Sequence, residues 1–242
     1  MAGVIPIVAL DFPEMWSALK LVSRLGDSCR FYKVGSELFT AGGPAVIEAL
    51  RNQECDVFLD LKLHDIPNTV AGAIRQIAEM DVRLTTIHAS GGRAMIEAAV
   101  EAAGDSCEVF AVTILTSLDA SALRETIGPA TGSVADMVLR LAELASASGA
   151  RGIVCSGQEA KLIRDRFGTK LKLLVPGIRL EGDSAGDQSR VVTPEAAVAA
   201  GADYIIIGRS VTAADDPEAA MNTVLQRMGQ VRTEDENSRT LD

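Results

Sequence analysis

Acidic and basic side chains alternate at the ends of the first three apolar segments of the chain. Asp11 follows the first segment, Lys33 lies in the second, and the third ends with Asp60 and Lys62. Opposite unit charges a few ångströms apart attract each other by roughly 4 kcal/mol at an effective dielectric near 20, so they hold one another ionised while partly desolvated. A lysine held between carboxylates stays protonated and can donate a proton. Solvated charges at strand ends would explain each residue singly, but the group predicts a catalytic cluster.

The elements that position these charges form a repeating pattern. Short apolar segments rich in β-branched residues lie at 4–10, 31–34, 57–61, 84–88, 109–115, 152–155, 171–175 and 203–207. Helix-like stretches follow them at 13–26, 43–53, 68–80, 92–103, 133–148, 157–167, 194–200 and 215–229. Eight β-then-α units in 242 residues predict a (β/α)8 TIM barrel as a single α/β domain over residues 1–229.

An open doubly wound sheet is the structural alternative to the barrel. Such a sheet usually has a glycine-rich turn after its first strand, where this chain has Asp11-Phe12-Pro13. Residues 230–242 are polar, and we expect them to form a poorly ordered C-terminal tail.

In a TIM barrel the active site lies at the carboxyl ends of the strands. Because side chains alternate along a strand, Asp60 and Lys62 share one face and the neighbouring leucines share the other. The leucines must meet the surrounding helices, so the two charged side chains are expected to point into the barrel mouth. Asp65 belongs to the turn that follows.

Residues after the last two strands predict an anion site. Arg179 follows the seventh strand, and Gly208 and Arg209 follow the eighth. Loops after strands seven and eight commonly bind phosphate in such barrels. A glycine lets backbone amides approach the anion, and an arginine adds a bidentate donor. A turn that merely caps a helix could contain the same residues.

Two long connections, 116–132 and 176–193, are typical of binding loops. Thr116 and Ser117 could hydrogen-bond a ligand or simply cap the loop. Gln188 could reach over a phosphorylated ligand or stand in solvent.

Composition excludes several classes of protein. With 23 Lys and Arg against 33 Asp and Glu, the net charge of −10 argues against nucleic acid or an anionic membrane as the main partner. No uncharged apolar run approaches the length of a membrane-spanning helix. The first residues lack the positive region of a signal peptide, so we expect a cytoplasmic protein.

The four cysteines are too far apart in the sequence for a zinc knuckle or a redox dithiol, and we expect buried thiols. Two histidines are too few for a metal site built on several imidazoles. A magnesium ion bound by carboxylates stays open.

The run Asp60-Leu61-Lys62-Leu63-His64-Asp65-Ile66-Pro67-Asn68-Thr69 resembles the D-x-K-x-x-D-I-P-N-T signature of the orotidine 5′-monophosphate decarboxylase family. The resemblance covers nearly the whole barrel, through Ala9-Leu10-Asp11, Phe31-Tyr32-Lys33-Val34-Gly35, His88-Ala89-Ser90-Gly91-Gly92, Leu115-Thr116-Ser117, Pro176-Gly177-Ile178-Arg179, Gly186-Asp187-Gln188 and Ile207-Gly208-Arg209. One departure is Leu180, where many members have proline.

The resemblance implies a role for each charged residue at the mouth. Asp11 would hydrogen-bond the ribose, and Lys33 would contact its hydroxyls and join the charged network. Asp60 would lie beside the substrate carboxylate, and Lys62 would deliver the proton. Asp65 and Thr69 would reach across a homodimer interface into the partner's site.

The resemblance also implies contacts for the rest of the ligand. Thr116 and Ser117 would meet the pyrimidine, and Gln188 would bridge the base and the phosphate. Arg179, Gly208 and Arg209 would hold the phosphate. The family uses neither metal nor organic cofactor, so the resemblance implies metal-free decarboxylation of orotidine 5′-monophosphate to UMP and CO2, with UMP biosynthesis as its setting.

Two alternatives stay open at this point. A magnesium-dependent phosphosugar decarboxylase or lyase could use a similar Asp-x-Lys-x-x-Asp run on a related barrel, although the Asp-Ile-Pro-Asn-Thr continuation disfavours it. A non-catalytic barrel that binds a nucleotide would have no need of the costly charged cluster.

Overall fold

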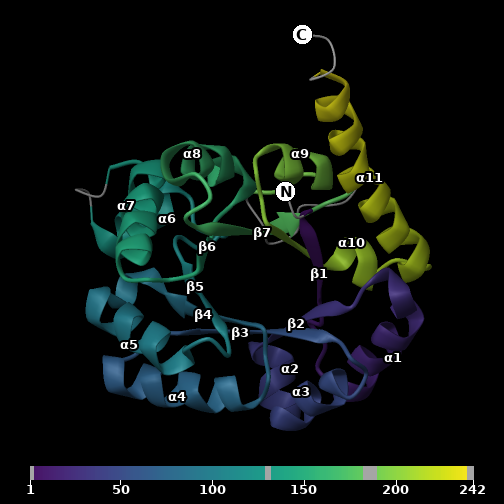
Figure 1. Ribbon diagram of the computed structural model, residues 1–242, viewed down its shortest axis with the longest axis horizontal. Helices are drawn as coiled ribbons and strands as arrows, with labels where there is room; N and C mark the ends of the chain where they lie inside the picture. Colours follow the sequence, from purple (N-terminus) through teal and green to yellow (C-terminus); the bar gives the residue numbers. More distant parts are fainter. Residues whose placement is uncertain (1–2, 129–131, 182–189, 239–242) are drawn as a thin grey trace.

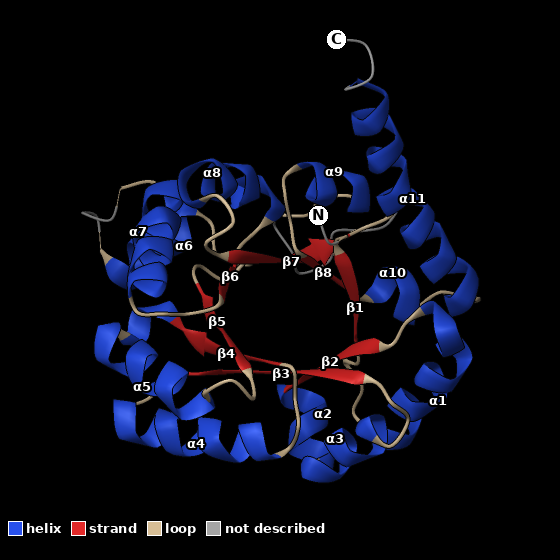
Figure 2. Cartoon of the chain, viewed as in Figure 1, coloured by secondary structure: helices blue, strands red, loops and turns tan. Residues whose placement is uncertain are grey.

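The computed structural model describes residues 3–128, 132–181 and 190–238. Within these ranges eight parallel strands form a closed ring, and helices surround it (Figure 1, Figure 2). Strands that follow one another along the chain are neighbours in the ring, and β8 closes it by pairing with β1. The strands are β1 (Ile5–Ala9), β2 (Phe31–Gly35), β3 (Asp56–Leu63), β4 (Leu84–His88), β5 (Glu108–Val112), β6 (Gly152–Val154), β7 (Lys172–Ile178) and β8 (Tyr204–Ile207). Each predicted strand overlaps one of them, and the predicted (β/α)8 barrel is confirmed.

Helices occupy the outside of the ring (Figure 2). They are α1 (Met15–Leu25), α2 (Ser36–Gly42), α3 (Pro44–Arg51), α4 (Pro67–Glu79), α5 (Arg93–Ala103), α6 (Ala120–Ile127), α7 (Val134–Ala147), α8 (Gly157–Phe167), α9 (Pro194–Ala199), α10 (Arg209–Thr212) and α11 (Pro217–Ser238). Two 3-10 turns, η1 (Gly26–Ser28) and η2 (Ala89–Gly91), follow α1 and β4. Each predicted helix corresponds to one of these helices. The sequence did not predict α2, α6 and α10, which are all short.

Helix α6 corrects the expectation of a long loop over 116–132. The carboxylate of Asp119 caps the helix by accepting hydrogen bonds from the backbone N–H groups of Ser121 and Ala122, at 2.8 and 2.9 Å. Such a cap satisfies donors that have no partner inside the helix. The eight-residue helix was missed because so short a polar segment shows little apolar periodicity.

Apolar side chains fill the interior of the barrel beneath the carboxyl ends of its strands. This inner core is a separate cluster from the one between strands and helices, and it consists of Ile7, Ala9, Phe31, Phe58, Leu84, Phe110, Leu174, Tyr204 and Ile206. The Tyr204 ring packs edge-on against Phe31 and Phe110, with centroids 6.1 and 5.8 Å apart. Strands buried on both faces are the expected state of a parallel sheet covered by helices.

The C-terminal helix α11 extends past the outline of the barrel (Figure 1). The predicted domain boundary at residue 229 therefore falls inside a helix, and residues 239–242 lie outside the described part of the chain. A poorly ordered tail from residue 230 stays a prediction, as does the cytoplasmic location. Across the residues that the structure describes, none of the helices is long and apolar enough to span a membrane.

Candidate active site

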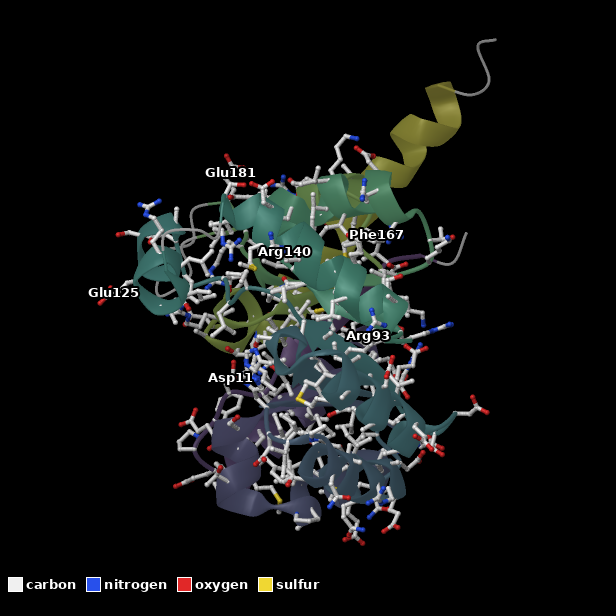
Figure 3. The ribbon with its side chains drawn as sticks, turned by 90° about the vertical axis from the view of Figure 1, so that its left-hand side faces the viewer. Asp11, Arg93, Glu125, Arg140, Phe167 and Glu181 are labelled. Carbon is white, nitrogen blue, oxygen red and sulfur yellow. The ribbon has the colours of Figure 1, made fainter. Side chains whose placement is uncertain are left out.

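The charged residues predicted from the first three strands meet at the carboxyl end of the barrel. The Lys33 ammonium lies 2.8 Å from Asp11 Oδ1 and 3.9 Å from Asp60 Oδ2. The Lys62 ammonium lies 2.7 Å from the same Asp60 oxygen. The side chains of Lys33 and Asp60 are about nine-tenths buried, whereas that of Asp11 is 60% exposed. Figure 3 shows Asp11 at one side of the molecule, beside a gathering of side-chain nitrogen and oxygen atoms.

Gly35, the last residue of β2, leaves room for one of these ion pairs. A Cβ atom at this position would lie 2.9 Å from Lys33 Nζ and 3.2 Å from Asp11 Oδ1. Real Cβ atoms essentially never lie as close as 2.9 Å to another atom, so a larger residue would displace the Lys33 ammonium, and at 3.2 Å it would also crowd the Asp11 carboxylate.

The backbone at Lys62 departs from the regular strand that the sequence predicts. Lys62 has a φ of +49°, and the pairing of β3 with β4 changes register between Leu59 and Leu63. The simple alternation expected for this strand is therefore wrong at Lys62, although the lysine does face the mouth. A β-bulge of this kind re-aims a side chain, and such bulges are common beside active sites.

A buried threonine on the neighbouring strand contacts this bulge. The Thr86 hydroxyl donates a hydrogen bond to Asp60 Oδ1 at 2.8 Å and accepts one from the Lys62 backbone N–H at 3.0 Å. The sequence did not reveal Thr86, because a β-branched residue inside an apolar strand is typical of a packed core. The signal that could have found it is the hydroxyl next to the predicted charged strand.

The charged cluster forms one wall of a cavity of about 660 Å³. This volume is within the usual range for sites that bind small molecules. Nine predicted site residues line it: Asp11, Lys33, Asp60, Lys62, Thr116, Ser117, Arg179, Gly208 and Arg209. Apolar residues line the rest, among them Ala9, Phe58, Val112, Ile114, Val154, Leu174 and Ile206. Four lining side chains are cationic and two are carboxylates, so the cavity favours a ligand with more than one negative charge.

The loop after β7 is held at both of its ends near Arg179. The Arg179 backbone N–H donates to Val192 O at 3.0 Å, and Val192 N–H donates to Gly177 O at 3.2 Å. Gly177 has a φ of +78° and lies where the pairing of β7 with β8 changes register. This bend directs Arg179, which is buried, toward the cavity.

A buried ion pair that the sequence did not reveal supports the other side of the cavity. The Arg190 guanidinium contacts the Glu159 carboxylate of α8 and donates to Leu115 O at 3.0 Å. Ser156 supports the same carboxylate through its backbone N–H, at 3.0 Å. Arg190 therefore ties the loop after β7 to the loop after β5, one residue before Thr116. Its role was missed because an arginine in a polar loop usually points to solvent.

Among the described residues, two predicted site residues do not line the cavity. Asp65 and Thr69 are exposed, and the Asp65 carboxylate accepts a hydrogen bond from the Ile66 backbone N–H at 2.6 Å. Their exposure fits the expectation that they serve a partner's site, which stays a prediction. Gln188 lies outside the described residues.

Two histidines lie side by side next to the cluster. The rings of His64 and His88 have centroids 5.4 Å apart. Burial lowers the pKa of His88 below its ordinary value of 6.5, and the neighbouring His64 and Lys62 lower it further. Within the described ranges no three His, Cys, Asp or Glu side chains gather in a way that could hold a metal ion.

Comparisons with known proteins agree with the resemblance in the sequence. A model of the "Orotidine 5'-phosphate decarboxylase / HUMPS family" matches residues 6–224. The chain is 52% identical over 217 residues to the orotidine 5′-phosphate decarboxylase of Halorhodospira halophila, covering 88% of this chain and 91% of that protein. It is 49% identical over 226 residues to the enzyme of that name from Thermobifida fusca, covering 92% and 96%. A crystal structure of orotidine 5′-phosphate decarboxylase from Lactobacillus acidophilus superposes with a TM-score of 0.83 at 36% identity, covering 94% of this chain and 99% of that one.

Proposed function

The chain belongs to the orotidine 5′-phosphate decarboxylase / HUMPS family and is a decarboxylase of that family, and we propose that it converts orotidine 5′-monophosphate to UMP and CO2 with its own side chains. This reaction is the last step of UMP biosynthesis. The observation that carries the proposal is the Lys62 ammonium, held 2.7 Å from Asp60 in a cavity that Arg179 and Arg209 also line.

The chemical difficulty of this reaction is the carbanion left at C6. The bond between C6 and the carboxylate carbon breaks, CO2 leaves, and the electron pair stays on C6 in the plane of the ring, where the π system delocalises it poorly. A fixed ammonium beside C6 stabilises that charge without reorganising solvent. Lys62 fills this role and then transfers a proton from Nζ to C6, which completes UMP and leaves a neutral amine that solvent reprotonates.

The partners of Lys62 keep its charge in place before the reaction. Asp60 binds both lysines through Oδ2, so the ammonium of Lys62 has a defined position when the substrate enters. The substrate carboxylate would lie beside the Asp60 carboxylate, and their repulsion would raise the energy of the bound substrate relative to the transition state. Asp11 and Lys33 would bind the ribose, because they lie together at the open side of the cluster.

The remaining contacts follow from the positions of the other lining residues. Arg179, Gly208 and Arg209 would hold the phosphate, and Thr116 and Ser117 would hydrogen-bond the pyrimidine. Binding energy gained at the phosphate can then be used to order the reacting end of the substrate. Gln188 would bridge the phosphate and the base.

Activity with purified protein tests the reaction and the role of Lys62. In excess EDTA the protein should remove the ultraviolet absorbance of orotidine 5′-monophosphate, and Lys62→Ala should abolish turnover while leaving UMP binding largely intact. Lys161→Ala is a matched control, because Lys161 is 74% exposed on α8 and pairs with Asp165. Near-normal turnover by the Lys62 variant would refute its assignment.

The two alternatives predict other results in the same assay. Loss of activity in EDTA with recovery on adding magnesium would favour the magnesium-dependent phosphosugar decarboxylase or lyase. UMP binding without any turnover would favour a non-catalytic nucleotide-binding barrel.

We also propose that two copies of the chain form a homodimer in which Asp65 and Thr69 complete the partner's site. Both side chains are exposed and stand outside the cavity of their own chain, and the intervening Ile66 is an apolar residue with 67% of its surface exposed. Packing against a second copy of the chain would remove the exposed surface of Ile66 from water.

Mixing two inactive variants tests the shared site. In a heterodimer of Lys62→Ala with Asp65→Asn, one of the two sites has only native residues, so a statistical mixture should recover about a quarter of wild-type activity. The control mixture is Lys62→Ala with Lys33→Ala, which should stay inactive because each site then lacks one of its own lysines. No recovery in the first mixture would contradict the shared site.

A further inference from the structure

Thr86 lies behind the charged cluster and does not line the cavity. Its side chain is fully buried on β4. The hydroxyl has two partners on β3: it donates to Asp60 Oδ1 at 2.8 Å and accepts from the Lys62 N–H at 3.0 Å. One side-chain oxygen therefore contacts both the carboxylate of Asp60 and the backbone of Lys62, the residue that would deliver the proton.

The bulge in β3 explains why this hydroxyl is needed. Between Leu59 and Leu63 the register of β3 against β4 shifts, so the regular ladder of backbone hydrogen bonds is interrupted there. Lys62 occupies the left-handed region with a φ of +49°, a conformation that costs energy for a residue with a side chain. A partly buried N–H group without an acceptor would add a further penalty. The Thr86 hydroxyl supplies the acceptor and so favours the bulge.

The same hydroxyl fixes the orientation of the Asp60 carboxylate, so that one oxygen binds Thr86 and the other faces the lysines. Asp60 Oδ1 accepts from Thr86, which leaves Oδ2 for Lys62 at 2.7 Å and for Lys33 at 3.9 Å. Rotation of the carboxylate would break the short contact with Thr86. The Thr86 side chain thus holds Lys62 at two places: it binds the backbone N–H directly, and it positions the ammonium through Asp60.

We propose that Thr86 is a positioning residue for the decarboxylation, one that sets the place of the Lys62 ammonium relative to the substrate. The inference rests on the proposed function. Because Thr86 acts through Asp60 and Lys62, its loss should affect the chemical step and leave substrate binding at Arg179 and Arg209 intact.

Thr85, the preceding residue, provides a matched control. It is equally buried, and its hydroxyl also donates across to β3, but to the backbone oxygen of Leu59 at 3.0 Å. Thr85→Val and Thr86→Val therefore remove the same group from adjacent positions of one strand. Only Thr86→Val removes it from the charged cluster.

The test compares kcat, KM and UMP affinity for wild type, Thr85→Val, Thr86→Val and Thr86→Ser. Hydrogen bonds to charged groups contribute about 1.5–3 kcal/mol, so Thr86→Val should lower kcat by roughly 10- to 100-fold while KM and UMP affinity change less than about twofold. Thr86→Ser keeps the hydroxyl and should restore most of the rate, and Thr85→Val should leave kcat near wild type. If the valine variant does not fold, the pair Thr86→Ser and Thr86→Ala makes the same comparison.

The possible failures are distinguishable. An active wild type with equal kcat for Thr86→Val and Thr85→Val would refute the positioning role alone. Equal losses in kcat and in UMP affinity for Thr86→Val would also refute it, because they indicate general distortion of the site. A folded wild-type protein that does not decarboxylate orotidine 5′-monophosphate would refute the proposed function itself, and the positioning role with it.

Discussion

The buried pair of Glu159 and Arg190 allows a quantitative prediction about stability. Both side chains are about nine-tenths buried. Besides each other they bind backbone groups: Arg190 donates to Leu115 O at 3.0 Å, and Glu159 accepts from Ser156 N–H at 3.0 Å. The pair therefore links α8, the loop after β5 and the return of the loop after β7.

The perturbation is Glu159→Gln, which removes the negative charge and keeps the shape of the side chain. The guanidinium of Arg190 then stays buried without a counter-charge, and breaking a buried pair in this way costs about 3–5 kcal/mol. For a chain of this size each kcal/mol corresponds to roughly 2–4 °C, so the melting temperature should fall by about 10 °C. Replacing both partners, as Glu159→Leu with Arg190→Met, should destabilise less than the single change, because no unpaired charge remains.

Urea and thermal unfolding of these variants provide the measurement, with Asp165→Asn as the control. Asp165 pairs with Lys161 on the same helix, but the two side chains are 62% and 74% exposed. Exposed pairs contribute little, so this control should change the free energy of unfolding by less than about 0.5 kcal/mol. A Glu159→Gln variant whose free energy of unfolding lies within about 1 kcal/mol of wild type would show that the buried charge of Arg190 does not depend on Glu159.

Two further predictions concern the surroundings of the cluster. Gly35→Ala should raise KM for orotidine 5′-monophosphate by roughly tenfold. The alanine Cβ would disturb the Lys33–Asp11 pair, and the site would lose about one charge-assisted hydrogen bond to the substrate. An unchanged KM in steady-state kinetics would contradict this prediction. Burial lowers the pKa of His88 in the folded state. As the pH falls below 6.5, the unfolded chain therefore binds more protons at this residue than the folded chain, and the free energy of unfolding decreases. Unfolding followed from pH 7.5 to 5 should show a weaker pH dependence for His88→Asn, and equal slopes for the variant and wild type would show that His88 does not contribute.

The sequence carried much of the fold because the barrel repeats one simple pattern. Each strand is a short apolar segment that must be covered on both faces, and each longer helix shows its own periodicity. The clustering of charges at the strand ends could also be predicted, because the topology of the barrel brings Asp11, Lys33 and Asp60 to one edge whatever the details of packing. The sequence did not predict helices α2, α6 and α10, because they are too short to show the apolar periodicity of a helix.

The features that the sequence did not reveal depend on pairing between strands or across loops. The segment from Leu59 to Leu63 alternates regularly as a sequence, and only its register against β4 produces the bulge at Lys62. Thr86 looks like a core residue because its two partners lie on another strand. Arg190 looks like a solvated loop residue because Glu159 is 31 positions away.

The inner core of the barrel has a consequence for how small molecules reach and leave the cavity of the proposed enzyme. In the described part of the chain, side chains such as Phe58 and Leu174 both line the cavity and belong to the cluster that fills the barrel interior. In the proposed enzyme, substrate and product would therefore enter and leave at the carboxyl end of the strands, where the lining residues Asp11 and Arg209 are exposed. UMP would then have to leave before the next orotidine 5′-monophosphate could bind. The two nucleotides would compete for the same cavity, so accumulating UMP would inhibit the reaction competitively.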